Sequence, residues 1–265
     1  MKTLAKLFTF VNNEEYLLRY WLPYHARFFG YKNIFVIDQN STDNTEKICK
    51  QYIKEGLNYS RAKTRFSAKS KMLSRLMSVN KKESKFLFAL DADEFLVYYE
   101  NGNIIVDEAT INNKLQKLLD ANRYQLTELR ALSKKVNYDN SLLEINEFFH
   151  CNMAKLKKVF YPGKFFISTD QGNHRGRVSN RSSIHQSNFS YLHFNYRSYQ
   201  HFVDKVKKGI GAYNYDINSK PKSGKHWMSA YKEILAGRGE KYYRKIYNKK
   251  GIVYKDFSTL IKNYE

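Results

Sequence analysis

The sequence predicts an α/β protein whose sheet is mixed, mainly parallel, and flanked by helices. In the first hundred residues, short continuous apolar runs alternate with segments whose apolar residues recur at helical spacing. Continuous apolar strands are typical of a parallel sheet that is covered on both faces. Polar clusters follow three of these runs, and such sheets bind ligands at the carboxyl ends of their strands.

Two strands and two helices are expected within residues 7–55. Leu7–Val11 is a short apolar strand, and Glu14–Phe29 carries apolar residues at helical spacing. The second strand is Asn33–Ile37. Ser41-Thr42-Asp43 then supplies capping residues for a helix that runs to about residue 55.

The next two strands lead to the pair of aspartates on which the functional prediction depends. A short third strand is expected around residues 57–60, a helix over Ala68–Val79, and a strand over Lys85–Leu90 that runs into Asp91-Ala92-Asp93. The later elements that we expect are a helix over Thr110–Ala121, a strand over Arg123–Arg130, a hairpin over Val159–Ile167, a strand over Phe189–Phe194 and a helix over Ser198–Lys208. We predict one domain over residues 1–215 and a basic helical extension over residues 216–265.

Composition excludes several classes of protein. With 42% hydrophobic residues and 3 prolines in 265 residues, the chain can bury a core and is not disordered. Two cysteines are too few for a disulfide scaffold and lack metal-ligand spacing. No run approaches the roughly 18 apolar residues of a membrane helix, and residues 1–11 resemble a buried strand more than a signal peptide. We therefore expect a cytoplasmic protein.

The net charge of +21 is concentrated in three segments. Residues 61–85, 153–181 and 220–265 carry +8, +6 and +8, so the rest of the chain is close to neutral. Regional basicity indicates an anionic partner. The last segment interleaves lysines with tyrosines, which suits an anionic membrane surface or single-stranded nucleic acid, and composition does not separate the two.

Asp91 and Asp93 leave an apolar strand with one residue between them. In an extended segment both side chains would point to the same side. Carboxylate oxygens suit Mg²⁺ or Mn²⁺, which usually complete their shells with substrate phosphates. Such an ion would neutralise a leaving diphosphate.

Taken in order, several blocks resemble glycosyltransferases of the GT-A fold, specifically the bacterial family-2-like group related to family 92. The blocks are Asn12-Asn13-Glu14-Glu15-Tyr16-Leu17, Trp21-Leu22-Pro23-Tyr24-His25, Ile37-Asp38-Gln39-Asn40-Ser41-Thr42-Asp43, Leu90-Asp91-Ala92-Asp93-Glu94-Phe95 and Leu192-His193-Phe194-Asn195-Tyr196-Arg197-Ser198. The resemblance covers residues 5–100 well and 155–210 in patches. It implies a nucleotide-sugar donor, a divalent cation, and transfer to an acceptor hydroxyl.

The resemblance also implies roles for single residues. It places Asn12, Glu14, Asp38 and Ser41 on the nucleotide, Asp91 on the metal and the diphosphate, and Asp93 on the metal, with His193 as the first choice for a further metal ligand and His174 as the second. From the basic stretch itself, Arg65 is a candidate for a donor phosphate. His25 is expected to be structural.

A carboxylate must take the proton of the acceptor hydroxyl in an inverting transfer, an outcome that the resemblance implies. Asp170 is our candidate because it is the only acid between Glu147 and Asp204 and lies in a loop with glycine and histidine. Glu144 and Glu147 are alternatives. A loop salt bridge from Asp170 to a neighbouring arginine is an equally open interpretation.

Together these points predict a metal-dependent glycosyltransferase using Mn²⁺ or Mg²⁺ and a nucleotide-sugar, with UDP as the expected nucleotide. The acceptor would be a glycan or a lipid-linked glycan of bacterial surface polysaccharide, such as capsule or lipopolysaccharide, made at the inner face of the cell membrane. The alternative is a nucleic-acid- or anionic-surface-binding protein without catalysis. It leaves the strand-end polar clusters unexplained, so no nucleic-acid partner is favoured.

Overall fold

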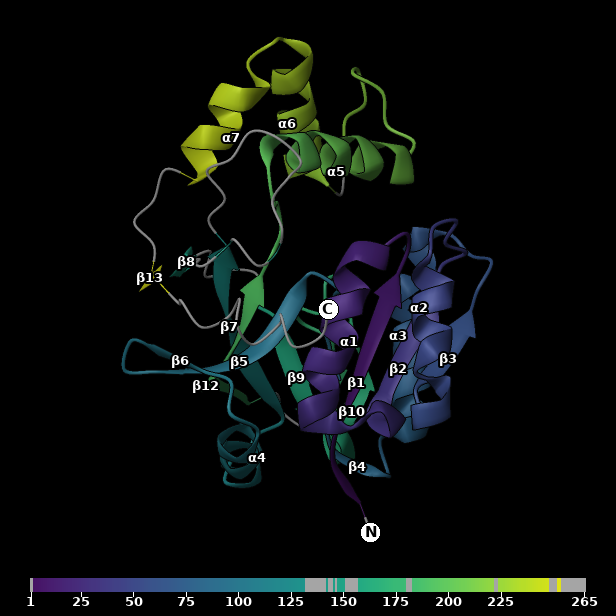
Figure 1. Cartoon of the computed structure of the whole chain (residues 1–265), viewed down its shortest axis with the longest axis vertical. Coiled ribbons are helices and arrows are strands. Elements are labelled where there is room, and N and C mark those ends of the chain that lie inside the picture. The colour runs from purple at the N-terminus through teal and green to yellow at the C-terminus, as the bar shows by residue number, and fades with distance from the viewer. Residues whose placement is uncertain are drawn as a thin grey trace. The chain divides into compact units, whose positions relative to one another are not determined.

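The computed structural model describes residues 2–131, 142, 145, 147–150, 157–179, 183–221, 224–247 and 252–253. The chain forms two compact units, shown in Figure 1. The first comprises residues 1–129, 150–193 and 263–265, and the second comprises residues 130–149 and 194–262. The domain boundary expected at residues 215/216 stays a prediction.

A mixed sheet forms the centre of the first unit, with strands in the order β3-β2-β1-β4-β9-β7-β12-β5-β6. Their bounds are β1 Thr3–Val11, β2 Ile34–Asp38, β3 Asn58–Arg61, β4 Ser84–Ala89, β5 Glu94–Glu100, β6 Asn103–Ile105, β7 Arg123–Ala131, β9 Val159–Pro162 and β12 Ile184–His193. The run from β3 to β4 is parallel, and β9, β5 and β6 join by antiparallel pairs. The predicted α/β class is confirmed.

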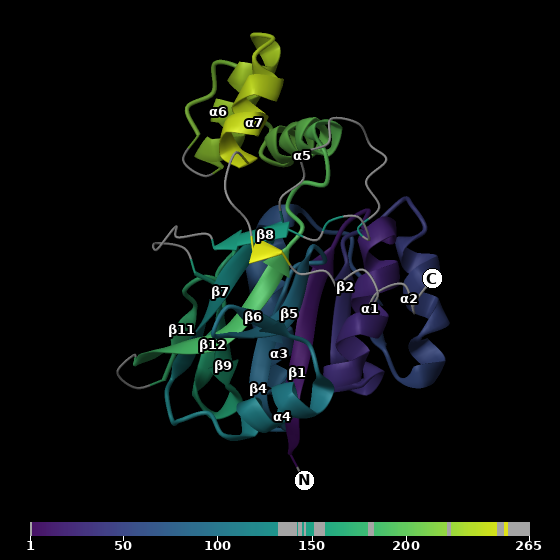
Figure 2. The ribbon, with the colours of Figure 1, turned by 60° about the vertical axis from the view of Figure 1, so that its left-hand side comes forward.

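Helices connect the parallel strands. They are α1 (Glu15–Phe29), α2 (Thr45–Gln51) and α3 (Lys69–Asn80), and α4 (Glu108–Gln116) follows β6. The strand order reverses at β1, so right-handed crossovers place α1 and α2 on one face and α3 on the other. Figure 2 lets the reader follow α1 and α2 side by side. Two faces of the parallel strands are thereby covered, which explains their continuous apolar sequences.

Alternation along β1 divides the core between these faces. Phe8 and Phe10 belong to a cluster with Leu73 and Met77 of α3 and with Tyr161 of β9. This pattern follows from the period-2 geometry of a strand.

Several predicted elements differ from the structure. The second helix ends at Gln51 and a short 3-10 helix, Ile53–Glu55, follows it. The hairpin expected over Val159–Ile167 is wrong, because β9 pairs with β4 and β7 while β10 (Phe166–Ser168) pairs with β11 (Arg177–Val178). A 3-10 turn over Gly163–Phe165 separates β9 from β10. Gly163 has no room for a Cβ, which would lie 2.3 Å from the carbonyl oxygen of Lys81.

The described residues of the second unit form the helices α5 (Tyr199–Ala212), α6 (Lys225–Leu235) and α7 (Gly239–Tyr247), with most of β8 (Glu147–His150) and β13 (Ile252–Val253). Its core is a cluster rich in aromatic residues. Among the tyrosines and tryptophan of the basic segment, Tyr243 is buried, and Trp227, Tyr231 and Tyr242 pack against that cluster. Within the described residues, no helix is long and apolar enough to span a membrane.

Candidate functional site

The carboxyl ends of β1, β2 and β4 meet at one edge of the sheet. β1 lies between the other two and pairs Val11 with Asp38 and Phe8 with Ala89. The three polar segments predicted at strand ends, residues 12–14, 38–41 and 91–94, therefore share this edge, where ligands of such sheets bind.

The polar residues after β1 and β2 tie these two loops together. Asn12 Nδ2 donates a hydrogen bond to the backbone carbonyl of Gln39 at 2.7 Å. Ser41 Oγ accepts one from the backbone N–H of Asn13 at 2.8 Å. Two predicted nucleotide contacts, Asn12 and Ser41, are thus brought together by hydrogen bonds that shape the loops.

Asp38 is fully buried and anchors the second loop. Its Oδ1 accepts the backbone N–H of Ser41 at 2.8 Å, and its Oδ2 accepts the hydroxyl of Tyr59 at 2.7 Å. Arg61 Nε lies 3.9 Å from the same Oδ2. Burial, together with the hydrogen bond to Asp38, raises the pKa of Tyr59 above its ordinary value, so this phenol stays a donor.

Glu14 and Arg65 lie at the starts of helical segments. Glu14 directly precedes α1, and its backbone N–H donates to Thr45 Oγ1 at 2.9 Å. Arg65 is exposed and precedes the 3-10 helix Phe66–Ala68. Arg65 therefore lies on the chain just before α3, whose first residue, Lys69, belongs to the charged cluster described next.

The chain between β4 and β5 makes a tight turn at the aspartate pair. The backbone N–H of Glu94 donates to the carbonyl of Asp91 at 3.0 Å. The expectation of an extended segment is wrong, because residues 91–94 form a turn. Asp91 pairs with lysines, whereas Asp93 faces His193.

Asp91 is held between two buried lysines. Lys69 Nζ lies 2.5 Å from Asp91 Oδ1, and Lys158 Nζ lies 2.8 Å from Oδ2. The lysine side chains are 5% and 3% exposed, whereas that of Asp91 is 32% exposed. Burial opposes ionisation of Asp91, but the charges of Lys158 and Lys69 outweigh it and hold its pKa below the ordinary value. Asp91 is therefore a carboxylate.

Glu94, the first residue of β5, is buried beneath the same cluster. Its Oε2 lies 2.6 Å from Lys158 Nζ and accepts the backbone N–H of Asp91 at 2.9 Å. Its own backbone carbonyl accepts the indole N–H of Trp21 at 2.8 Å. Burial raises the pKa of Glu94 to about 7, although the charge of Lys158 opposes this.

Asp93 and Glu128 flank the imidazole of His193. The pairing of β5 with β12 sets His193 opposite Glu94. His193 Nε2 lies 3.4 Å from Asp93 Oδ2, and Nδ1 lies 2.7 Å from Glu128 Oε1. Burial lowers the pKa of His193, but the charge and hydrogen bond of Asp93 and the contact with Glu128 raise it to about 9.

These groups fit a divalent cation. Asp93, Glu94 and His193 each offer one ligand atom, and the three atoms lie within 4.8 Å of one another. A histidine that binds a metal usually has its other ring nitrogen hydrogen-bonded to a carboxylate or carbonyl, and Glu128 Oε1 lies in that position at His193. The imidazole favours Mn²⁺ over Mg²⁺, which prefers oxygen. Asp91 lies outside this group of three.

The loop that carries Asp170 borders the cluster. Asp170 Oδ1 accepts the backbone N–H groups of His174 at 2.6 Å and Arg175 at 3.3 Å. Burial and the charge of Lys158 lower the pKa of His174, while Asp170 and Asp91 act in the opposite direction. The backbone N–H of Val159, next to Lys158, donates to the carbonyl of Asn173 at 3.0 Å, so this loop lies beside the lysine that contacts Asp91.

The other predicted residues have different surroundings. Glu147 lies on β8 in the second unit, and Glu144 lies outside the described residues. His25 is completely buried; its Nε2 accepts the backbone N–H of Leu96 at 3.1 Å. The structural interpretation of His25 is confirmed.

Four charged residues of the site have roles that the sequence did not indicate: Lys69, Glu94, Glu128 and Lys158. Lys69 and Lys158 lie within two of the three basic segments, where they resemble surface lysines. One feature of the sequence could have indicated that Lys158 is buried: it directly precedes the apolar strand β9, where an apolar residue is more usual. The sequence gives a weaker indication for Glu128, which is an acidic residue within a predicted strand.

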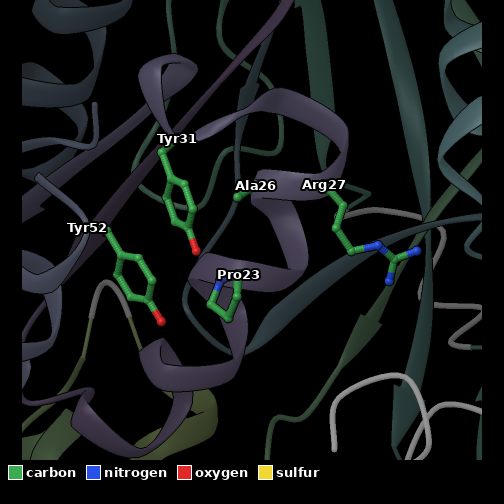
Figure 3. A pocket seen from close by; sticks show the side chains of 5 residues that line it. All are labelled: Pro23, Ala26, Arg27, Tyr31 and Tyr52. Carbon is green, nitrogen blue, oxygen red and sulfur yellow. The ribbon is translucent and has the colours of Figure 1, made fainter. Parts of the chain in front are cut away.

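A separate hollow of about 450 Å³ lies beside α1 and contains none of the residues predicted for the site. It is lined by Pro23, Ala26, Arg27, Tyr31 and Tyr52 (Figure 3). The rings of Tyr31 and Tyr52 stack with their centroids 4.7 Å apart. Arg27 extends away from these rings and donates to the carbonyl of Val106 at 2.8 Å.

Part of the chain matches a known protein family. Residues 8–97 match the model of glycosyl transferase family 2. The matched segment runs from β1 into β5 and includes Asn12, Asp38, Asp91 and Asp93. This segment is therefore similar to the family that its motifs predict, while a relation to family 92 stays a prediction. No curated protein matches the chain.

Solved structures with some similarity include glycosyltransferases. TarS 1-349 of S. aureus is 12% identical with a TM-score of 0.46, over 92% of this chain and 73% of that one, and it also has a structure in complex with UDP. The mannosyltransferase PcManGT from Pyrobaculum calidifontis, in complex with GDP-Man and Mn²⁺, is 12% identical with a TM-score of 0.42, over 100% of this chain and 85% of that one. At these values, the ligands of those proteins do not transfer to this chain.

Proposed function

We propose that this chain is a metal-dependent glycosyltransferase that moves a sugar from a nucleotide-sugar to an acceptor hydroxyl. One observation carries the proposal: Asp93, Glu94 and His193 each offer one ligand atom within 4.8 Å of the others, and Glu128 Oε1 lies 2.7 Å from the other ring nitrogen of His193. The family 2 match over residues 8–97 supports the reaction class.

Asp93 and His193 would hold the ion, with Glu94 next to them and Glu128 orienting the imidazole. When bound, a divalent cation neutralises charge on a leaving diphosphate. The proton on His193 Nε2 must leave before that nitrogen can act as a ligand. Mn²⁺ is the proposed ion because the ligand set combines carboxylate with imidazole.

The nucleotide-sugar would lie along the edge formed by residues 12–14, 38–41 and 91–94. Asn12, Asp38 and Ser41 stabilise the loops there and would present their backbone to the nucleotide. Glu14, Arg65 and Asp91 complete the proposed donor site. We propose a UDP-sugar as donor.

Asp170 is the proposed base for the acceptor hydroxyl in an inverting transfer. Its Oδ1 accepts two backbone N–H groups, which fix the direction of the carboxylate, as positioning of a general base requires. An Asp170→Asn variant should keep donor and metal binding while losing transfer to an acceptor.

The proposed acceptor is a glycan or lipid-linked glycan of bacterial surface polysaccharide, reached at the inner face of the cell membrane. Exposed cations of α6 and α7 support this placement: Lys225, Lys232, Lys241 and Lys245. Because the described aromatic residues of this segment pack inward, the cations rather than the rings would meet anionic lipid. Vesicles with and without anionic lipid would measure this contribution.

The test is release of nucleoside diphosphate from a panel of nucleotide-sugars with Mn²⁺, with Mg²⁺ and with EDTA. Wild type is compared with Asp93→Asn and with Asp107→Asn, a matched change at the exposed N-cap of α4. We expect metal-dependent release of one nucleoside diphosphate that only Asp93→Asn abolishes. Absence of both turnover and metal-dependent nucleotide binding, with salt-sensitive oligonucleotide binding instead, would favour the nucleic-acid alternative.

A further inference from the structure

Two of the three basic segments of the chain meet in the first unit, at α3 and at the loop that follows β10. Ser74 Oγ of α3 accepts the backbone N–H of Thr169 at 2.9 Å. Gln171 Oε1 accepts the backbone N–H of Ser70, also of α3, at 3.3 Å. The loop that carries the proposed base therefore lies along one side of this helix.

Four exposed cations lie beside this contact, and we name them the α3 band: Lys71, Arg75, Arg175 and Arg177. Lys71 and Arg75 are one helical turn apart, about 6 Å along the axis of α3. Each of them directly follows a serine that is hydrogen-bonded to the loop. Arg175 belongs to the loop itself, where its backbone N–H donates to Asp170 Oδ1 at 3.3 Å.

The side chains of the α3 band form no ion pair with any other described residue. The sequence of α3 has no acidic residue, and the carboxylate of Asp170 accepts backbone N–H groups instead. Elsewhere on the first unit, exposed cations have acidic partners: Lys50 pairs with Glu46, Lys114 with Glu100 and Lys164 with Asp120. A surface of one sign without counter-charges attracts ligands of the opposite sign.

We propose that the α3 band binds an acidic polysaccharide, a glycan chain whose anionic groups repeat along its length, as the acceptor of the transfer. This inference rests on the proposed function and names the class of its acceptor. The four cations are spread over a helix and a loop and do not converge on one point, which suits a chain better than a single small anion. Arginine binds carboxylate or phosphate groups with two parallel hydrogen bonds.

The position of the band favours an acceptor over a membrane or a nucleic acid. Lys69, the first residue of α3, contacts Asp91, and Arg175 is bonded to Asp170, so both ends of the contact lead to the candidate site. A chain on the band can present a hydroxyl there, which membrane docking does not require. Single-stranded nucleic acids bind by stacking bases on aromatic rings, whereas α3 has no aromatic residue and Phe66 before it packs against the core.

The experiment measures the fluorescence anisotropy of a labelled oligogalacturonate, a glycan with one carboxylate per sugar, titrated with the full chain. Lys71→Gln/Arg75→Gln is compared with Lys47→Gln/Lys50→Gln, which removes the same charge from exposed positions of α2 on the other face of the sheet. Each exposed ion pair strengthens binding by up to about fivefold, so the α3 variant should bind about tenfold more weakly. The α2 variant should keep the wild-type affinity.

Three results would overturn the assignment of the band. The first is equal affinity of the α3 variant and wild type for oligogalacturonate. The second is equal binding of an uncharged maltooligosaccharide of the same length, because charge would then not be recognised. The third is wild type that prefers an oligothymidylate or phosphatidylglycerol vesicles to the acidic glycan, because the occupant would then be a nucleic acid or a membrane.

Release of nucleoside diphosphate from the donor separates this inference from the proposed function. Release without an acceptor depends on the metal and the donor, so the α3 variant should keep the wild-type rate, which also shows that it is folded. If wild type releases nucleoside diphosphate but the α3 band fails the binding test, only the acceptor class is wrong. If wild type shows neither metal-dependent release nor metal-dependent nucleotide binding, the proposed function itself is wrong.

Discussion

The ends of β2 and β4 lie at the same sheet edge, but their aspartates are held in opposite ways. Asp38 is fully buried and accepts its hydrogen bonds from neutral donors, the backbone N–H of Ser41 and the hydroxyl of Tyr59, while the cation nearest to it, Arg61 Nε, is 3.9 Å away. Asp91 contacts two ammonium groups and remains partly exposed.

This difference separates a loop anchor from a reactive centre. Neutral hydrogen bonds are sufficient to stabilise a loop. Burying charges is unfavourable unless they are paired, and even a paired cluster contributes little net stability. The charges that the fold concentrates beyond β4 are therefore better explained by chemistry than by stability. The following predictions test that contrast, beginning with the largest effect.

The same substitution at the two strand ends should have opposite consequences. Asp93→Asn removes a proposed metal ligand, and a loss of about 4 kcal/mol of transition-state stabilisation should lower turnover on the order of 1,000-fold. Its stability should change little, since Asp93 also repels Asp91 and Glu94. Asp38→Asn should lower the free energy of unfolding by about 2 kcal/mol, because it disturbs a buried acceptor.

Urea unfolding and turnover of a nucleotide-sugar, measured on both variants, check this pair of predictions. If Asp93→Asn were destabilised but kept normal turnover, the residues after β4 would stabilise the fold and would not take part in the reaction.

Glu128 should affect the metal without touching it. Glu128→Gln weakens the contact that orients His193, and changes of this kind reduce metal affinity about 10- to 100-fold. Calorimetric titration with Mn²⁺ measures the effect. Glu100→Gln is the matched control, since Glu100 forms its ion pair with Lys114 away from His193. Equal Mn²⁺ affinity in Glu128→Gln and wild type would exclude the orienting role.

The sequence was a good guide to the parallel half of the sheet. β1, β2 and β4 are local apolar runs with helices between them, so their order follows from periodicity and crossover rules. β9 and β10 were harder, because antiparallel partners distant in sequence decide their pairing. A local turn signal at Pro162-Gly163 indicated a hairpin that the structure replaces with a 3-10 turn.

In the candidate site, residue types were predictable but their partners were not. Asp93 and His193 were named separately from the sequence, and the pairing of β5 with β12 brings them together. The lysines on Asp91 come from positions 22 and 67 residues away. No local pattern encodes such contacts, because they depend on which strands become neighbours.

His25 and His193 repeat the contrast between structure and chemistry, and His25 represents structure. His25 is buried, and burial lowers its pKa to about 3 although a hydrogen bond to the carbonyl of Trp21 opposes this. An unfolded histidine has a pKa near 6.5. Below that pH the unfolded chain takes up a proton that the folded chain refuses, so the contribution of His25 is complete above about pH 6.5 and is lost as the pH falls toward 3.

The expected loss between pH 7 and pH 5 is about 2 kcal/mol, from about 1.4 kcal/mol for each pH unit below 6.5. His25→Gln does not titrate, so its free energy of unfolding should fall by about 2 kcal/mol less over the same interval. Urea unfolding at pH 7, 6 and 5 compares the slopes, and any constant cost of the substitution cancels. Parallel slopes for the two proteins would show that His25 is not held neutral.

Substitution of Ser41 should have the smallest effect. It tests whether the loops after β1 and β2 are independent of the charged cluster after β4. Ser41→Ala removes the hydroxyl that accepts the backbone N–H of Asn13, while the backbone bond from Ser41 to Asp38 stays. Losing one such hydrogen bond should lower the free energy of unfolding by about 1 kcal/mol. Because that bond joins the loops after β1 and β2, Mn²⁺ affinity should not change, whereas UDP affinity should fall if the loop backbone lies against the nucleotide. Urea unfolding and the two titrations separate these effects. A change in Mn²⁺ affinity would mean that the loops after β1 and β2 are energetically coupled to the charged cluster after β4.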